Sequence, residues 1–220
     1  SERHTSLNEI IFYEQTGSLY DRAIRIDSLV KFIYKSIGNK KSDGISDYLL
    51  FSNADLGTEL VKEFPNLQGK VGGYLAKVEN VPKNICDAFS DQYEYDFSDS
   101  YTNFLTFILS ISQKFDSILG YFVSKDSLSG AGDPFGIRRS TLSIIKIFIE
   151  KKIRINFYNL FSLNNELYKN QNISLKIDYS YLFEFFKKRI SILLGEMGFR
   201  QDLIKASINQ EFDPYFIFER

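Results

Sequence analysis

Residues 101–122 read YTNFLTFILSISQKFDSILGYF, and the apolar letters in this stretch recur every three or four positions. This period places apolar side chains on one face of an α-helix, whereas a half-buried strand would alternate apolar and polar residues. The stretch therefore predicts a long helix over 101–122 that packs against the rest of the protein. The residues that share its apolar face are Phe104, Ile108, Ile111, Phe115, Ile118 and Phe122.

The same period continues on both sides of this stretch. Ser18 followed by Asp21 forms an acidic version of the capping box at the start of one predicted helix, and Gly38 ends that helix. Asp133 is predicted to cap another helix that begins at Pro134, because proline suits the first helical turn. No strand-like alternation extends over more than a few residues, so the predicted fold class is all-α. The predicted helices cover residues 18–37, 47–63, 69–77, 82–93, 101–122, 134–150, 156–168, 178–197 and 201–210.

Composition limits the classes of protein to which the chain can belong. Its 220 residues are 44% hydrophobic, which is enough for one sizeable core or two small ones. A net charge of −1 excludes a strongly basic nucleic-acid binder, so any nucleic-acid surface must be a local patch. The lone cysteine, Cys86, indicates a reducing compartment, and neither a bilayer-spanning run nor a signal peptide is seen, so we expect a cytoplasmic protein. The polar start and the aromatic end, 213–220, suggest a piece of a longer protein.

Four blocks of sequence resemble one known family. Residues 17–26 read GSLYDRAIRI, residues 54–69 read ADLGTELVKEFPNLQG, residues 114–119 read KFDSIL and residues 132–139 read GDPFGIRR. In this order and spacing, across about residues 8–210, they resemble the β-subunit of the bacterial two-subunit glycyl-tRNA synthetase. Any one block alone would be a weak signal, whereas the four together are specific.

The resemblance implies both a fold and a role. It implies a compact, helical domain of the HD type over residues 1–170, followed by a helical linker over 171–220 that leads toward an anticodon-binding domain. The family attaches glycine to tRNA-Gly with ATP, and the aminoacylation centre, with its ATP and magnesium, lies in the separate α-subunit. The chain is therefore expected to be a cofactor-free scaffold that contacts tRNA, without a catalytic residue. The implied partners are the α-subunit, the remaining β-subunit domains and tRNA-Gly, in an α2β2 enzyme with no membrane contact.

Basic residues near the GDPFGIRR block are the candidates for tRNA contact. Arginine binds phosphate well, and Arg138 and Arg139 lie in the first turns of the predicted helix. The alternative is structural, with these arginines pairing with acidic residues such as Glu59 or Asp96. A further basic run, 187–189, has the same two interpretations, RNA contact or a solvated face. The full candidate set is Arg138, Arg139, Lys146, Lys151, Lys152 and Arg154.

The metal chemistry of other HD-type proteins has little support in this chain. Metal-dependent phosphohydrolysis needs several His and Asp ligands, and the only histidine is His4, outside the helical body. Residues 53–55, which read Asn-Ala-Asp, stand where the His-Asp pair would be sought, and Gln113 stands where relatives tend to have an acid. Asp55 and Asp116 remain as vestigial metal-site positions, which are too few for a metal site. The alternatives to a synthetase part are a degenerate HD-type phosphohydrolase and a protein-interaction module.

Two further features have a functional and a structural interpretation. Gly69, Gly72 and Gly73 lack the Lys-Ser or Lys-Thr pair of a phosphate loop, so close helix packing is the expected reason for them. The aromatic loop predicted over 93–100, with Tyr101 directly after it, could stack on RNA bases or pack against protein. Packing against the protein is the expected outcome.

Overall fold

The computed structural model describes residues 16–38, 44–97, 103–124, 132–133, 135–173 and 177–220, and every regular element in these residues is a helix. The all-α fold class is therefore confirmed. The helices are α2 (Leu19–Ser36), α3 (Ser46–Leu49), α4 (Glu59–Glu63), α5 (Lys70–Val78), α6 (Lys83–Asp91), α7 (Phe104–Ser124), α8 (Ile137–Glu150), α9 (Phe157–Asn170), α10 (Tyr179–Glu196), α11 (Gln201–Gln210) and α12 (Pro214–Glu219), with two short 3₁₀ turns, η1 (Ala54–Gly57) and η2 (Pro65–Leu67).

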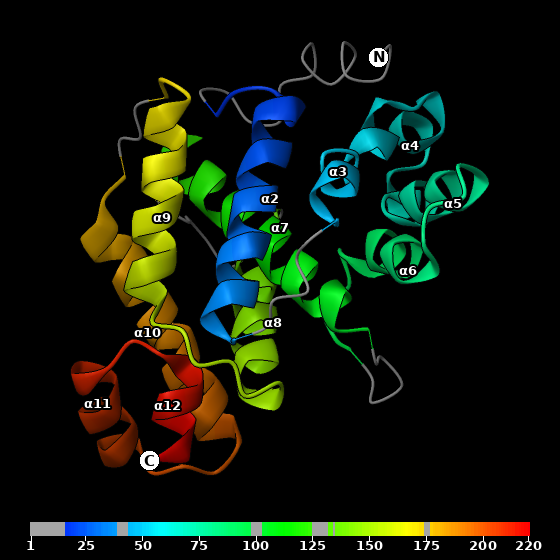
Figure 1. Ribbon diagram of the computed structural model, residues 1–220. Coiled ribbons are helices and arrows are strands. Elements are labelled where there is room, and N and C mark those ends of the chain that lie inside the picture. Colours follow the sequence, from blue (N-terminus) through cyan, green and yellow to red (C-terminus); the bar gives the residue numbers. More distant parts are fainter. Residues whose placement is uncertain (1–15, 39–43, 98–102, 125–131, 134, 174–176) are drawn as a thin grey trace.

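Helix α7 lies at the centre of the molecule. It packs against α2, α6 and α8 (Figure 1). Ile108 and Phe115 of its predicted apolar face are fully buried, and Leu109 and Leu119 on other sides are fully buried as well. Because neighbours surround α7, its apolar residues extend well beyond one stripe, as in other helices buried on all sides.

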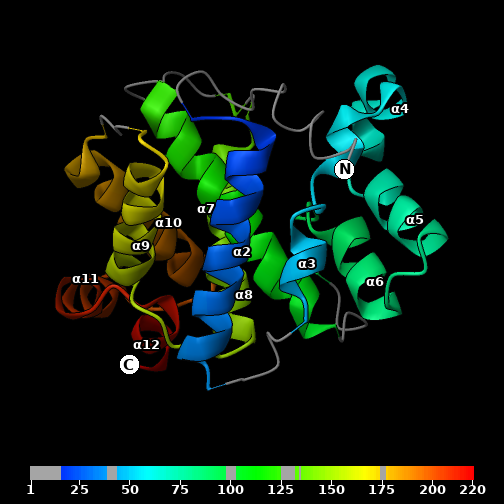
Figure 2. The same cartoon turned by 45° about the horizontal axis from the view of Figure 1, so that its top comes forward.

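The other helices form two groups on either side of α7. Figures 1 and 2 both show α3 to α6 on one side and α9 to α12 on the other. In the first group, α5 and α6 pack closely because Gly73 has no side chain: a Cβ there would lie 2.7 Å from the backbone oxygen of Cys86. The expectation that these glycines serve helix packing is therefore confirmed at Gly73.

Aromatic rings join the second group to α7. Phe115 on α7 contacts Phe161 on α9 and Phe186 on α10, with ring centroids 4.8 and 6.1 Å away. Phe212, which precedes α12, contacts Phe157 at 5.4 Å. The helices after residue 171 thus pack into the same core as the earlier ones. The division of the chain at residue 170 and the HD type of the domain remain predictions.

Apart from the region 47–63, the predicted helices agree with the structure to within three residues at either end. The capping box at the start of α2 is present: Ser18 Oγ accepts from the Asp21 N–H at 3.2 Å, and the Asp21 carboxylate accepts from the Ser18 N–H at 2.8 Å. The C-cap of α2 is Ile37, and Gly38 follows it with φ +72°. Local sequence signals therefore placed most helix ends correctly.

The prediction of one helix over 47–63 was wrong. The segment forms α3, η1 and α4 in succession. Ser52, Asn53 and Asp55 turn into the interior and are buried, and Thr58 caps α4 by accepting from the Val61 N–H at 3.2 Å. Short polar side chains of this kind compete with helical hydrogen bonds, so the apolar spacing of this segment misled the prediction.

The C-terminal segment 213–220, for which no element was expected, forms α12. Asp213 caps it by accepting from the Phe216 N–H at 3.1 Å, and Pro214 occupies its first turn. Its inward residue Ile217 is buried, and the helix packs back onto α8.

Candidate nucleic-acid interface and buried polar network

Helix α8 begins three residues later than the sequence predicted, at Ile137. Asp133 caps this helix although it lies four residues before its start. Its carboxylate oxygens accept from the N–H groups of Arg138 and Arg139, both at 3.1 Å. Pro134, the predicted first residue, lies outside the described residues. Gly136 makes the turn possible with φ +65°, and a Cβ there would lie 2.4 Å from the Tyr95 hydroxyl oxygen. The Gly136 N–H donates to the Asp133 backbone oxygen at 3.0 Å, so a turn precedes α8.

Arg138 and Arg139 have structural contacts and also reach solvent. Arg138 Nη1 donates to the Gly132 backbone oxygen at 2.9 Å. Arg139 Nε lies 3.6 Å from Asp133 Oδ2, its guanidinium lies 4.9 Å from the centre of the Tyr95 ring, and the residue is exposed. These contacts agree with a structural role for the two arginines, and their binding of phosphate stays a prediction.

The other candidates lie further along α8 and beyond it. Asp96, expected as a partner of Arg138 or Arg139, pairs with Lys146 instead, at 2.7 Å. Lys151 Nζ lies 4.2 Å from the centre of the Phe107 ring, and Lys152 is exposed with φ +55°. Arg154 forms ion pairs with Asp213 and Glu219. Most of these candidate residues therefore already have intramolecular contacts.

Distance along α8 separates the candidates into two groups. The helix has 14 residues, so its ends are about 20 Å apart at 1.5 Å per residue. Arg138 and Arg139 lie at its start, whereas Lys151, Lys152 and Arg154 follow its end. The structure does not bring these residues together into one patch.

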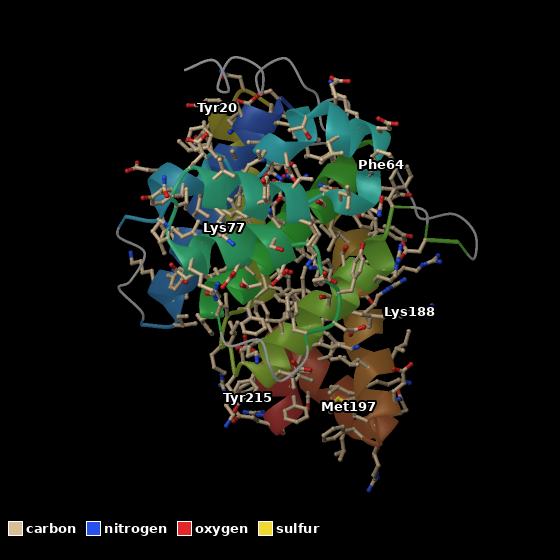
Figure 3. The ribbon with its side chains drawn as sticks, turned by 90° about the vertical axis from the view of Figure 1, so that its right-hand side faces the viewer. Tyr20, Phe64, Lys77, Lys188, Met197 and Tyr215 are labelled. Atoms are coloured by element: carbon tan, nitrogen blue, oxygen red, sulfur yellow. The ribbon has the colours of Figure 1, made fainter. Side chains whose placement is uncertain are left out.

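Arg138 has a basic neighbour on α10, Arg189, which was not in the full candidate set predicted from the sequence. Burial lowers the pKa of Arg189 below its ordinary value, and the nearby positive charge of Arg138 lowers it further. Lys188 is exposed on the same helix (Figure 3), whereas Lys187 pairs with Glu184 at 3.1 Å. The sequence signal for this surface was the basic run 187–189, but its closeness to Arg138 depends on how α10 packs on α8.

The aromatic loop packs against the protein. The Tyr93 hydroxyl accepts from Asn53 Nδ2 at 2.7 Å, and Phe97 meets Phe107 edge-on at 5.1 Å. Ser143 on α8 is buried and donates to the Tyr95 backbone oxygen at 2.7 Å. The expectation that this loop packs is confirmed for residues 93–97; residues 98–102 lie outside the described residues.

A buried lysine fastens this loop to α7. Lys114 Nζ donates to the backbone oxygens of Gln92 and Glu94 and contacts Ser110 Oγ. It also lies 5.4 Å from the centre of the Tyr95 ring. Burial lowers the pKa of Lys114 to about 7, so the charge on this side chain changes near neutral pH.

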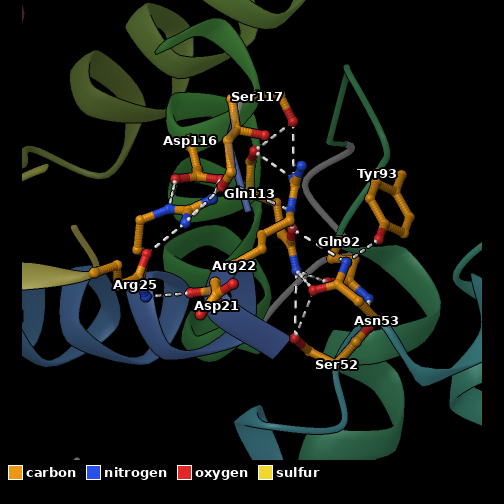
Figure 4. A network of polar contacts seen from close by, with 12 residues as sticks. Asp21, Arg22, Arg25, Ser52, Asn53, Gln92, Tyr93, Gln113, Asp116 and Ser117 are labelled. Atoms are coloured by element: carbon orange, nitrogen blue, oxygen red, sulfur yellow. Dashed lines mark hydrogen bonds and ion pairs between the residues drawn. The ribbon is translucent and has the colours of Figure 1, made fainter. Parts of the chain in front are cut away.

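Two buried arginines of α2 bind α7 in a network of polar contacts (Figure 4). Arg25 Nε and Nη2 donate to the two carboxylate oxygens of Asp116 at 2.7 and 3.2 Å, and Arg25 Nη1 donates to Gln171 at 2.7 Å. Arg22 Nη2 donates to Gln113 Oε1 at 2.9 Å. Burial alone would raise the pKa of Asp116, but the two guanidinium groups lower it below its ordinary value. Asp116 therefore stays ionised and acts as the counter-ion of α2.

The network continues from Gln113 toward Asn53 and Gln92. Gln113 Nε2 donates to Asn53 Oδ1 at 3.0 Å and to Gln92 Oε1 at 2.8 Å. Gln92 Nε2 in turn donates to the Ser52 backbone oxygen at 2.8 Å. These amides satisfy one another in the space between α7 and the broken segment 52–58, which explains why Asn53 and Gln113 are polar but buried.

Asp55 has a different set of partners. Its Oδ2 accepts from the Gly69 N–H at 2.6 Å, and burial raises its pKa above the ordinary value despite this hydrogen bond. A Cβ at Gly72 would lie 3.3 Å from the same carboxylate, so this glycine leaves room for it. Asp55 therefore ties η1 to the start of α5.

The residues present do not fit the metal centre that an HD-type fold implies. Within the described part of the chain, no group of three or more His, Cys, Asp or Glu side chains is arranged to hold a metal ion. Asp116 is bound by guanidinium groups and Asp55 by a backbone N–H. The two vestigial positions thus have separate structural partners.

The helices of the described residues include none that is long and apolar enough to cross a membrane.

Comparison with known proteins identifies the family. The glycyl-tRNA synthetase β-subunit family matches residues 1–209. The glycine–tRNA ligase β-subunit of Buchnera aphidicola subsp. Acyrthosiphon pisum (strain Tuc7) is 35% identical over 210 residues, and that of Rickettsia prowazekii (strain Madrid E) is 32% identical over 215. These alignments cover 94% and 96% of this chain but 30% of each relative, so the chain spans less than a third of their length. With a match that runs across nearly all of its helical fold, the chain belongs to the glycyl-tRNA synthetase β-subunit family.

Proposed function

We propose that this chain is a non-catalytic scaffold that contacts tRNA within the β-subunit of glycine–tRNA ligase, the enzyme that uses ATP to attach glycine to tRNA-Gly. The observation that carries the proposal is the family match across residues 1–209. The ATP and magnesium of the reaction belong to the α-subunit in this proposal, and no residue of the chain is catalytic. Its partners are the α-subunit, the rest of the β-subunit and tRNA-Gly, in an α2β2 enzyme of the cytoplasm.

The start of α8 supports a contact with the phosphate backbone. The junction of α8 and α10 carries four cations, on Arg138, Arg139, Lys188 and Arg189, and the Asp133 carboxylate lies near Arg139 and acts on Arg189. A local excess of positive charge attracts RNA even when the net charge of the chain is near zero. The remaining predicted contacts should contribute less to RNA binding, because most of them already interact within the chain. They are Lys146, Lys151, Lys152 and Arg154.

The experiment is a measurement of tRNA-Gly binding to the chain over a series of salt concentrations. Binding should weaken linearly on a log–log scale as salt rises, and Arg139→Gln should reduce both the affinity and the slope, the latter by about one. Arg154→Gln is the matched control, since Asp213 and Glu219 already bind that guanidinium, and it should change the slope little. Equal effects of the two variants would contradict the assignment of the contact to the start of α8.

Glycylation by the intact enzyme tests the wider role. The α-subunit together with a complete β-subunit containing this sequence should attach glycine to tRNA-Gly, and this chain alone should not. Failure of the intact enzyme to charge tRNA-Gly would overturn the proposal. Binding of the chain without charging by it would support a scaffold that contacts tRNA.

The two rival functions have less support. A degenerate HD-type phosphohydrolase lacks a ligand set in the described residues, and Asp116 already has its cations in Arg22 and Arg25. A pure protein-interaction module would use the aromatic loop as its surface, but Tyr93 and Phe97 contact Asn53 and Phe107 of the chain itself.

A further inference from the structure

Two aromatic rings, those of Phe135 and Tyr181, face solvent near Arg138 and Arg189. Phe135 is 45% exposed and Tyr181 is 37% exposed, although both are large aromatic residues. Phe135 directly precedes the turn at Gly136 before α8, and Tyr181 lies in the first turn of α10. They thus flank the same junction of α8 and α10 that carries the basic residues.

Buried rings of α7 support both from behind. Phe135 contacts Tyr121 with ring centroids 5.4 Å apart, and Tyr181 contacts Phe122 edge-on at 5.8 Å. Tyr121 and Phe122 are themselves buried. The exposed rings are therefore held by packing, which lowers the loss of side-chain entropy when a planar ligand stacks on them.

The cations lie close to these rings. Arg189 lies one turn beyond Phe185 and two turns beyond Tyr181 on α10, and its guanidinium stacks on the Phe185 ring at 3.6 Å. The charges of Arg138 and the hydroxyl of Tyr181 both act on the pKa of Arg189, so these three groups share one neighbourhood. Within the described residues, no carboxylate lies at ion-pair distance from Arg189 or Lys188.

The carboxylate of Asp133, which acts on the pKa of Arg189, already has partners. Asp133 accepts from the N–H groups of Arg138 and Arg139 and lies 3.6 Å from Arg139 Nε. The positive charge of Arg138 lowers the pKa of Arg189, so the two guanidinium groups repel each other. A bound anion at this junction would relieve that repulsion, which favours a ligand with phosphate groups.

We propose that the junction of α8 and α10 is a binding site for an unpaired stretch of RNA, whose bases stack on Phe135 and Tyr181 while Arg138, Arg189 and Lys188 bind its phosphates. This inference rests on the proposed function and names which part of an RNA the site takes. Unpaired bases expose their faces to aromatic rings, whereas bases in a duplex are already stacked on their neighbours. A polyanion without bases would use the cations but leave the rings unused.

The test compares binding of a short unstructured RNA, its duplex form and poly-glutamate to the full chain by fluorescence anisotropy. The single strand should bind most tightly. Phe135→Leu and Tyr181→Leu should each weaken its binding by about 5- to 150-fold, the range that loss of one stacked base gives, without changing the salt slope. Arg189→Gln should reduce the slope by about one.

Tyr74→Leu is the matched control, because Tyr74 is 67% exposed on α5, on the other side of α7 (Figure 1). It should leave binding unchanged, and thermal unfolding should show that all variants remain folded. Ring variants that bind the single strand as well as the unchanged chain would overturn the inference. So would equal binding of the duplex or of poly-glutamate.

Failure of this inference can be told apart from failure of the proposed function. If an intact enzyme with Phe135→Leu and Tyr181→Leu charges tRNA-Gly with unchanged kcat/KM, the stacking site is wrong and the synthetase role stands. If the unaltered intact enzyme does not charge tRNA-Gly, the proposed function itself fails.

Discussion

Asp116→Asn tests whether charge, rather than shape, holds α2 against α7. The change keeps the size of the side chain but removes the negative charge that two buried guanidinium groups share. Arg25 and Asp116 have side chains that are only 1% exposed, so water cannot replace the lost partner. Arg22 lies 3.9 Å from the same carboxylate and loses its counter-ion as well.

The expected loss of stability follows from the geometry of this pair. Arg25 makes two hydrogen bonds to the carboxylate, at 2.7 and 3.2 Å, and hydrogen bonds to charged groups contribute about 1.5–3 kcal/mol each. Removing one partner of a buried ion pair costs about 3–5 kcal/mol because the other charge stays buried. A typical domain is stable by about 5–15 kcal/mol, so Asp116→Asn should remove a large share of the free energy of unfolding.

Urea unfolding followed by circular dichroism measures this loss. Asp96→Asn is the control, since the Asp96 and Lys146 side chains are 80% and 42% exposed, and breaking such a surface pair costs less than about 1 kcal/mol. A loss at Asp116 no larger than that at Asp96 would refute the reasoning.

The same pair gives a pH dependence with a definite sign. Because the folded-state pKa of Asp116 is lowered, its contribution is complete above the unfolded value of about 3.9 and is lost as the pH falls through the folded pKa. The difference in stability between the unaltered chain and Asp116→Asn should therefore shrink in acid.

Three further outcomes are expected. Gly136→Ala should cost more stability in a urea titration than Gly38→Ala, because both glycines have positive φ but only Gly136 faces a neighbour, Tyr95, at 2.4 Å from the new Cβ; equal losses would remove the steric argument. Burial lowers the pKa of Lys114 to about 7, so the unfolded chain binds more protons between about pH 7 and pH 10, and stability should rise across that window. Lys114→Met should abolish this rise, and an unchanged slope would show that another group causes it. Asp133→Ala should lower the thermal midpoint through a loss of about 1 kcal/mol of helix capping, with Asp133→Asn retaining most of the stability; equal midpoints for the two variants would argue against the cap.

Most of the helical fold was predictable because apolar spacing and end signals agree over the longer helices. At α2, Ser18 and Asp21 specify the start, and the apolar residues 26 to 33 specify the buried face. At 47–63 the spacing looked similar, yet buried Asn53 and Asp55 belong to a polar interior that exists only when α5 and α7 are in place. A pattern read along one segment contains no information about such distant partners.

The candidate site was predictable in its residue types but not in its grouping. Arg138 and Arg139 were found from the sequence, whereas Arg189 joined them only because α10 packs on α8. Lys146 was expected at a surface for RNA, and the structure gives it Asp96 as a partner from a loop 50 positions away. Asp55, which the sequence marked as a vestigial metal-site position, accepts from the Gly69 N–H, a partner that the sequence does not reveal.

The arginine pair of α2 also bears on the order in which the chain folds during synthesis. Arg25 needs Asp116, 91 positions later, and Gln171, 146 positions later. At roughly 5–20 residues per second a ribosome takes on the order of 10 s to make that intervening chain. Throughout that time α2 holds two guanidinium groups on the face that will be buried, and they keep it hydrated. We therefore expect α2 to dock on α7 only after Asp116 has been synthesised, because its buried guanidinium groups need that carboxylate as their counter-ion.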